Sequence, residues 1–329
     1  MAQNGRRQSN TRERSRGRRR RFRDKSPEAL YHSSNLNIAR FTKKFPFSLK
    51  LIGYCRVDPT EGERAVNELR FAREQLGLRG LKLHPRSEGW VDKTATEVPV
   101  KVLIEAAKYS MPIIFDTRGK RTILDIGTLV ARTRDVIKNK YPKLLRHFKV
   151  IIAHFAQGNV GDYDVYNTIV QPNTYGDLSM LHGEGAKNFF LDFQKWFKQT
   201  DRINIDGRDW SEYLLFATDY PYFGEMHAQK LLINLFNKEF FNNGGSIQDI
   251  KNILGLNQIK LLPEYNIKTI IAIIITAFII KILDDYLDFD EKGRFIEPVY
   301  EEVESSPLDM LDILSFDDVE LFAAQGVGH

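Results

Sequence analysis

The stretch GYCRVDPTEGERAVNELRFAREQLGLRGLKLHP (residues 53–85) joins two short apolar runs through an amphipathic segment. The runs, LKLIGYCRV (49–57) and RGLKLH (79–84), have the length and apolar character of β-strands. Between them, within 61–76, apolar residues recur at the spacing of one helix face: Ala65, Leu69, Ala72 and Leu76. The stretch therefore predicts a strand–helix–strand unit, the repeating unit of a parallel α/β sheet.

The same alternation continues toward the carboxyl terminus. Further strand-like runs are PIIFD (112–116), VIIAHF (150–155), TYGDLSM (174–180) and LLFATD (214–219). Helices are predicted at 98–109, 123–139, 185–198, 225–241 and 246–262. Six strands alternating with helices predict a parallel α/β sheet, either doubly wound or a (β/α)8 barrel of the TIM type. No GxGxxG or GxxxxGK[ST] loop is present, which weakens the nucleotide-binding alternative.

Charge is distributed unevenly along the chain, whose formal net charge is +5. Residues 1–25 hold ten Arg and one Lys against two carboxylates, a net charge of +9. Residues 284–329 hold fourteen Asp and Glu against two basic residues, a net charge of −12. We predict that 1–34 is a disordered Arg-rich tail, that 35–265 is the folded domain, and that 284–329 is an acidic tail.

Cysteine content and the amino-terminal sequence limit the class of protein. Cys55 is the single cysteine, which excludes a disulfide scaffold. The basic first 25 residues lack the apolar core of a secretory signal. An unpaired thiol without a secretory signal is typical of a cytoplasmic protein.

The run IKTIIAIIITAFIIKIL (267–283) is apolar at thirteen of seventeen positions, with Lys268 and Lys281 near its ends. As a helix it would extend about 25 Å. That is slightly short of a hydrocarbon core of about 30 Å, a gap that snorkelling lysines can close. We interpret 266–283 as a hydrophobic helix, with a membrane span, a buried helix and an aggregation-prone tail as alternatives. If it spans, the excess of basic residues places the folded domain on the cytoplasmic side.

Polar side chains stand at or just after the carboxyl ends of the predicted strands: Lys82, His84, Asp116, His154, Asp177, Ser179 and Asp219. In parallel α/β proteins these strand ends lie on one side of the sheet, where catalytic groups are found. Imidazole and carboxylate groups are ordinary ligands of zinc, and a carboxylate beside a metal can take a proton from bound water. The pattern predicts a divalent metal site or an acid–base site.

Each of these residues also has a structural explanation. A strand-end histidine such as His154 is commonly a hydrogen-bonded packing residue, and an aspartate such as Asp116 or Asp219 is commonly a cap. His84, followed by a proline, can simply end its strand. Lys82 is harder to explain in this way, because burying an ammonium group without a partner is costly. The occurrence of such residues on consecutive strands favours a functional site.

Several segments, taken in order, resemble the amidohydrolase superfamily, in its branch of metal-dependent hydrolases and decarboxylases. They are GYCRVDP (53–59), LRGLKLHP (78–85), MPII (111–114), VIIAH (150–154) and LFATDYP (215–221), and the resemblance covers roughly residues 35–265. It implies a distorted (β/α)8 barrel with one divalent metal, usually zinc, and a small-molecule carbonyl or carboxylate substrate. It also implies that metal-bound water attacks a carbonyl, or that the substrate decarboxylates, while an aspartate shuttles a proton.

The resemblance assigns roles to individual residues. His154 and Asp219 take the positions of metal ligands, and Asp219 is also the proton shuttle. Asp116 stands where the family has a histidine and is a substitute ligand. Lys82 and His84, at the end of the strand 79–84, are further catalytic candidates. The family's first-strand HxH or ExH pair is absent from residues 1–48, and no apolar strand is available there. We therefore expect an incomplete barrel of about six βα units, whose open strand edges another segment or chain must cover.

Three hypotheses follow for the function. The first is a metal-dependent hydrolase or decarboxylase. The second is a catalytically inactive, barrel-derived scaffold, tethered to a membrane through 267–283 or assembled as a homo-oligomer. Its Arg-rich start could attract nucleic acid or anionic lipid, but Phe22 is the only aromatic residue there, so base stacking is not indicated. The third is a misplaced reading-frame start, with the missing strands encoded upstream.

Overall fold

The computed structural model describes residues 28–44, 51–90, 100–157, 159–181, 183–219 and 224–262. Chain contacts divide the protein into Met1–Phe278 and Ile279–His329, and every described residue belongs to the first unit. The predicted hydrophobic helix at 266–283 and the acidic tail lie outside the described residues. No described helix is both long enough and apolar enough to cross a bilayer.

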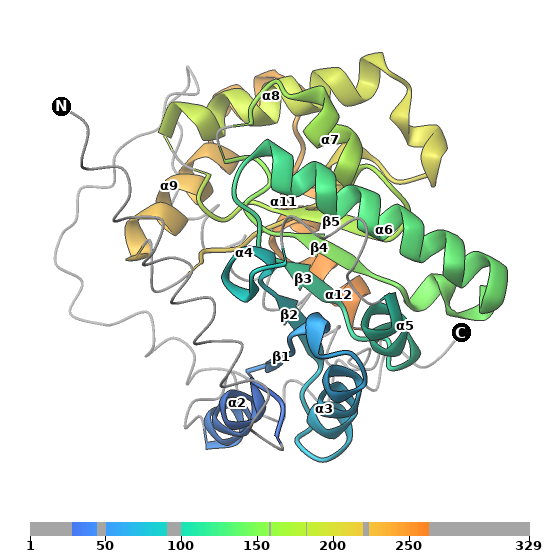
Figure 1. Cartoon of the computed structure of the whole chain (residues 1–329). Helices are drawn as coiled ribbons and strands as arrows, with labels where there is room; N and C mark the ends of the chain where they lie inside the picture. Colours follow the sequence, from blue (N-terminus) through green and yellow to red (C-terminus); the bar gives the residue numbers. More distant parts are fainter. Residues whose placement is uncertain are drawn as a thin grey trace, which may run out of the picture. The chain divides into compact units, whose positions relative to one another are not determined.

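Six parallel strands form one sheet, in the order in which they occur along the chain (Figure 1). They are β1 (Tyr54–Arg56), β2 (Gly80–Leu83), β3 (Ile113–Phe115), β4 (Val150–Ile152), β5 (Thr174–Asp177) and β6 (Leu214–Leu215). Each strand lies within one of the six predicted runs, which confirms the predicted strands. A doubly wound sheet reverses its strand order at a switch point. The uninterrupted order is therefore that of a TIM-type barrel, here an incomplete barrel of six strands.

Helices connect successive strands. The long ones between strands are α3 (Glu63–Glu74), α5 (Val100–Lys108), α6 (Lys120–Lys140) and α8 (Gly183–Gln199), while α9 (Gly224–Leu235) and α10 (Lys238–Asn242) follow the last strand, β6. Shorter ones are α4 (Pro85–Glu88) and α7 (Tyr163–Ile169), and η1 (Pro59–Glu61), η3 (Pro142–His147), η4 (Arg202–Ile205) and η5 (Trp210–Tyr213) are 3-10 turns. The predicted helix at 225–241 is two helices, because Asn237 caps a new helix by accepting a hydrogen bond from the Glu239 N–H. The predicted helix at 246–262 consists of α11 (Ile247–Lys251), a π-helical turn η6 (Asn252–Leu256) and α12 (Asn257–Leu261).

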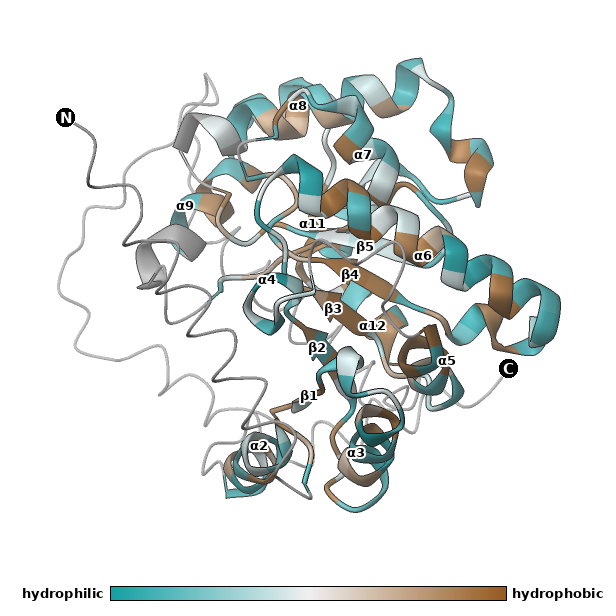
Figure 2. Cartoon of the chain, in the orientation of Figure 1, coloured by the Kyte–Doolittle hydropathy of each residue, from teal (hydrophilic) through white to brown (hydrophobic). Residues whose placement is uncertain are grey.

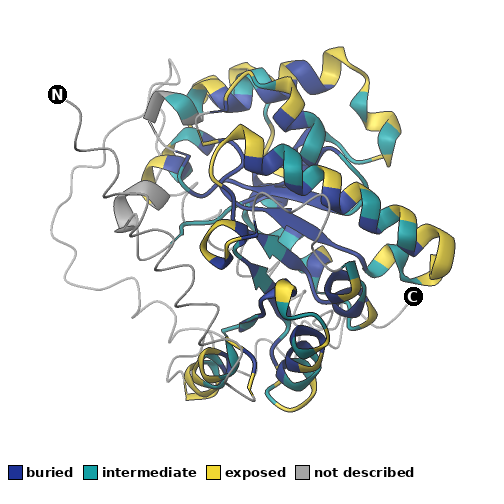
Figure 3. Ribbon diagram, viewed as in Figure 1, coloured by how far each residue is buried: buried dark blue, intermediate teal, exposed yellow. Residues whose placement is uncertain are grey.

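The two faces of the sheet are covered differently. Leu81, Ile113, Val150 and other outward residues pack beneath the helices in one large apolar core. On the inner face, Ile151, Tyr175 and Leu215 pack against Leu261 of α12. Figures 2 and 3 show this layering, with apolar, buried strands at the centre and polar, exposed surfaces on the outer helices.

Side-chain amides from flanking helices cover both open edges of the sheet. At the β1 edge, Asn35 of α2 (His32–Lys44) donates to the Arg56 carbonyl (2.9 Å) and accepts from the Arg56 N–H (2.8 Å), as a neighbouring strand would. At the β6 edge, Asn257 donates to the Leu214 carbonyl (2.8 Å) and Gln258 donates to the Phe216 carbonyl (2.7 Å). At each edge expected to be open, side chains of the same chain thus pair with peptide groups, those of Arg56 on one side and of Leu214 and Phe216 on the other.

Helix α2 is the largest difference from the predicted organisation, because it begins at His32, inside the segment predicted to be a disordered tail. Only Asn35 and Ala39 of this helix are buried. Because only two positions are buried and one of them is polar, the sequence of this helix has little of the apolar periodicity from which a helix is predicted.

Replacing Asn35 by alanine is expected to lower the free energy of unfolding by roughly 2–3 kcal/mol, because it leaves buried donors and acceptors without partners. Asn35 also donates to Glu68 (2.7 Å), so the substitution removes a contact to α3 as well. Urea unfolding measures the effect, and Asn37→Ala, at an exposed position of the same helix, is the matched control. Equal stability of the two variants would show that α2 does not protect the β1 edge.

Candidate active site

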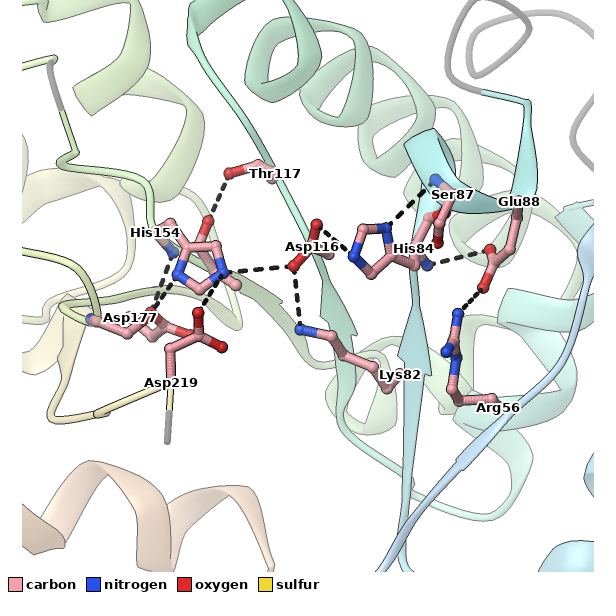
Figure 4. Close-up of polar contacts among 12 residues, drawn as sticks. Arg56, Lys82, His84, Ser87, Glu88, Asp116, Thr117, His154, Asp177 and Asp219 are labelled. Atoms are coloured by element: carbon pink, nitrogen blue, oxygen red, sulfur yellow. Dashed lines mark hydrogen bonds and ion pairs between the residues drawn. The ribbon is translucent and has the colours of Figure 1, made fainter. Parts of the chain in front are cut away.

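The carboxyl ends of five consecutive strands bring their polar side chains into one cluster (Figure 4). Lys82 and His84 come from β2, Asp116 follows β3, His154 follows β4, Asp177 ends β5, and Asp219 follows β6. All six residues, and Ser179 beside Asp177, had been identified as strand-end residues in the sequence. The structure therefore brings the predicted site residues together, while their roles in catalysis or metal binding stay predictions.

Asp116 lies at the centre of the cluster. Its Oδ1 atom lies 3.6 Å from the Lys82 Nζ atom and 3.3 Å from the His154 Nε2 atom. Its Oδ2 atom lies 2.9 Å from the His84 Nε2 atom. The His84 Nδ1 atom accepts a hydrogen bond from the Ser87 N–H (3.4 Å), so the ring proton belongs on Nε2, facing the carboxylate.

Electrostatics keep Asp116 ionised although it is buried. Burial by itself would raise the pKa of this carboxyl group. Hydrogen bonds from His154 and His84 and the charge of Lys82 outweigh the effect of burial and hold the pKa well below its ordinary value. Asp116 therefore acts as a permanent negative charge at the centre of the site.

His154 adopts an unusual backbone conformation. Its φ is +57°, in the left-handed region that non-glycine residues seldom occupy. Asp177 Oδ1 holds this conformation by accepting the His154 N–H (3.0 Å), and the imidazole Nδ1 atom lies 2.6 Å from Ser179 Oγ. Strained backbone of this kind is concentrated at functional sites.

The neighbouring carboxylates also affect the ionisation of His154. Burial would lower the pKa of the imidazole, but the hydrogen bond to Asp116 and the charges of Asp177 and Asp219 raise it above its ordinary value. His154 therefore holds its second proton more strongly than an isolated histidine, which suits a group that donates and accepts protons.

Asp219 completes the cluster on the other side of His154. Its Oδ2 atom lies 3.9 Å from the His154 Nε2 atom, and its φ is +52°. Asp219, whose side chain is 27% exposed, thus lies next to the buried His154, which in turn contacts the buried Asp116. The TDYP motif continues into Tyr220 and Pro221, which lie outside the described residues.

Exposure separates the cluster into two layers. The side chains of Asp116 and His154 are 6% and 4% exposed, respectively. Those of Lys82, His84 and Asp219 are 28%, 23% and 27% exposed, respectively. The side chains of the outer three residues are therefore partly accessible to solvent, and those of the inner two are shielded beneath them.

A second hydrogen-bond network, formed by Glu88, Trp90 and Arg56, holds the backbone of His84. These three residues were not predicted as site residues. Buried Glu88 accepts hydrogen bonds from the His84 N–H (3.0 Å) and from Trp90 Nε1 (2.8 Å), and it pairs with Arg56 (3.1 Å). Burial raises the pKa of Glu88, and the hydrogen bonds from these groups oppose that rise. The signal in the sequence was the HPRSEGW run (84–90), in which a proline starts a short helix that ends in Glu88.

The His and Asp side chains of the cluster, as they are arranged in the structure, do not fit a bound metal ion. Among the described residues, no group of three His, Cys, Asp or Glu side chains is placed to hold a metal. Both oxygens of Asp116 already face nitrogen partners, including the cationic Lys82. A metal ligand at this position would have to exchange those partners for the ion.

Two surface hollows lie away from the cluster. One, of about 20 Å³, adjoins Phe190 and Phe240, and the other, of about 480 Å³, adjoins Lys198, Asp249 and Lys260. Neither is lined by a residue of the strand-end cluster. The chemistry of the side chains, and not the size of a hollow, therefore locates the candidate site.

No family model and no curated protein matches the chain. Solved structures do match it, among them a protein of Staphylococcus aureus assigned as an amidohydrolase (TM-score 0.47, 17% identity, 71% of this chain and 80% of that chain). Others are 2,6-dihydroxybenzoate decarboxylase from Rhizobium (0.44, 13%, 71% and 77%) and 4-oxalomesaconate hydratase from Rhodopseudomonas palustris (0.42, 14%, 75% and 73%). These neighbours catalyse different reactions and are distant, so the reaction of this chain has to be inferred from its own site.

Proposed function

We propose that the chain is a hydrolase or decarboxylase that acts on a small-molecule carbonyl or carboxylate substrate at the strand-end cluster. The observation that supports this proposal most is the two-layer arrangement. Partly exposed Lys82, His84 and Asp219 stand in front of buried Asp116 and His154. A cation, an imidazole N–H and a carboxylate gathered at the carboxyl ends of neighbouring strands are groups that such reactions use.

In this proposal the outer residues divide the chemistry among them. The Lys82 ammonium would stabilise negative charge on a carbonyl or carboxylate oxygen of the substrate, and the His84 Nε2–H would join it by turning away from Asp116 Oδ2, which it faces at 2.9 Å. The Asp219 carboxylate would take a proton from the attacking water and return it to the leaving group. His154, hydrogen-bonded to Asp116, would exchange protons with Asp219 across the 3.9 Å between them.

Turnover assays of the full chain test this proposal. The substrate panel contains aryl esters and amides, followed by release of the alcohol or amine, and hydroxybenzoates including 2,6-dihydroxybenzoate, followed by release of carbon dioxide. We expect turnover of at least one class, and loss of that turnover in His154→Ala. Turnover that survives in His154→Ala would contradict the proposed site, and no turnover with any panel member would favour the inactive scaffold.

Among the properties that the resemblance implies, dependence on a metal ion is the one that the arrangement of His154, Asp219 and Asp116 supports least. We therefore expect protein purified without added metal to contain no stoichiometric zinc, and we expect a chelator to leave turnover unchanged. Elemental analysis and the panel assay with and without EDTA measure both quantities. One zinc per chain, lost in His154→Ala and required for turnover, would instead establish the metal-dependent form, with His154, Asp219 and Asp116 as ligands.

A further inference from the structure

Asp177 gathers three hydrogen bonds on a single oxygen atom. Its Oδ1 accepts the His154 N–H (3.0 Å), the Ser179 N–H (3.1 Å) and the Ser179 hydroxyl. An ionised carboxylate can only accept hydrogen bonds, and a serine hydroxyl has one proton to donate. The Ser179 proton is therefore committed to Asp177.

This commitment decides which imidazole nitrogen of His154 carries a proton. Ser179 Oγ lies 2.6 Å from His154 Nδ1, and the hydroxyl, having donated to Asp177, can only accept at that contact. Nδ1 must therefore be protonated. His154, Asp177 and Ser179 are 5%, 8% and 2% exposed, so solvent has little access to replace these bonds.

We infer that Asp177 and Ser179 are positioning residues that hold His154 in its Nδ1–H form, so that in the neutral ring Nε2 is the nitrogen without a proton. Nε2 faces Asp116 Oδ1 at 3.3 Å and Asp219 Oδ2 at 3.9 Å. The mechanistic meaning of this assignment rests on the proposed function, although the hydrogen-bond geometry does not.

Asp116 and Asp219, the two carboxylates beside Nε2, are the reason why the hydrogen-bond chain from Asp177 through Ser179 to Nδ1 matters. Without it, neutral His154 would be drawn to the Nε2–H form, because that proton could be donated to Asp116. The ring would then hold its only proton in the bond to Asp116, and Nε2 could not accept another from Asp219 or a substrate. The Asp177–Ser179 pair opposes this through geometry: Ser179 Oγ lies 2.6 Å from Nδ1, closer than the 3.3 Å between Nε2 and Asp116 Oδ1, and its hydroxyl has no second proton to donate to Nδ1.

Nitrogen NMR of the full chain, labelled with 15N-histidine, tests the inference without a substrate. Long-range 1H–15N correlations distinguish Nδ1–H from Nε2–H, and His154→Asn identifies the signals. We expect wild type and Ser179→Thr, which retains a hydroxyl, to show Nδ1–H in the neutral ring. Ser179→Ala should lose that signal in favour of Nε2–H. Ser211→Ala, which changes another buried serine, one that bonds to Asn252, should match wild type.

An Nε2–H ring in the wild-type protein would overturn the inference, as would an unchanged ring in Ser179→Ala. If Ser179→Ala does not fold, the wild-type and Ser179→Thr spectra still decide the result. Turnover is a separate measurement, in which Ser179→Ala should reduce kcat by about 10- to 100-fold and Ser179→Thr should restore much of it. A chain without turnover but with the Nδ1–H ring would remove the proposed function and leave the hydrogen-bond assignment standing.

Discussion

Asparagine in place of Asp116 is expected to lower the free energy of unfolding by about 3 kcal/mol at pH 7, because it removes the negative charge shared by three nitrogen groups. Lys82, His84 and His154 all lie within 3.6 Å of this carboxylate. Removing one member of a buried ionic cluster leaves the others uncompensated. The lower end of the usual range applies, because Lys82 and His84 are partly exposed.

The pH dependence of this loss gives a second measurement. The pKa of Asp116 is held below its ordinary value, so its stabilising contribution is present above the unfolded-state pKa of about 3.9. That contribution is lost as the pH falls from there toward the folded-state pKa. The difference between wild type and Asp116→Asn should therefore shrink between pH 5 and pH 3, whereas between pH 7 and pH 5 it should grow, because Asp116 raises the pKa of His154. Urea unfolding at these three pH values measures it.

Asp164→Asn is the matched control for Asp116→Asn. Asp164 also pairs with a lysine, Lys120 at 2.9 Å, but its side chain is 69% exposed. Its replacement should leave the urea midpoint unchanged, because exposed pairs are solvated and screened. If Asp116→Asn were as stable as this control, Asp116 would not be the electrostatic centre of the cluster.

The second large effect is expected at Asp219, where the variant Asp219→Asn should reduce kcat by about 100- to 10,000-fold, because an amide cannot take up a proton. Little stability should be lost. Asparagine tolerates the left-handed backbone that the φ of +52° requires. The panel substrate that the wild-type chain turns over gives the kcat, and thermal unfolding shows whether the fold is retained.

Asp201→Asn is the control for Asp219→Asn, because Asp201 has nearly the same backbone conformation, with a φ of +51°, and lies on the surface away from the cluster. We expect full turnover in this variant. Turnover in Asp219→Asn equal to that of the control would show that another group shuttles the proton. Together with Asp116→Asn, the pair separates a residue needed for the structure of the site from one needed for its chemistry.

The strand-end residues were predictable because of a general property of parallel sheets. Each strand runs in the same direction, so the residues at the carboxyl ends of 79–84, 112–116 and 150–155 must meet on one side. Local sequence was therefore sufficient to predict that Lys82, Asp116 and His154 are neighbours. It was not sufficient to predict that Asp116 would be the centre, since that depends on side-chain distances among three strands.

The supporting residues depend on contacts that local patterns do not encode. Glu88 is on a four-residue helix and supports His84 through a backbone N–H. Asp177 reaches back 23 residues to the His154 N–H. Each of these hydrogen bonds joins a side chain to a peptide group whose position depends on the packing of other helices and strands. The spacing of residues in the sequence therefore does not predict them.

The chain's own sequence predicted six strands, their approximate positions along the chain and the side of the sheet on which the polar residues gather. These features follow from apolar periodicity, which acts over a few residues, and from the single direction of a parallel sheet. Only the tertiary structure decided how the two sheet edges are covered and which nitrogen of His154 is free. Both depend on single side-chain groups, Asn35 and Ser179, whose hydrogen-bond partners lie 21 and 25 residues away in the chain. Such bonds are directional and short-ranged, so they exist only once folding has brought those atoms together.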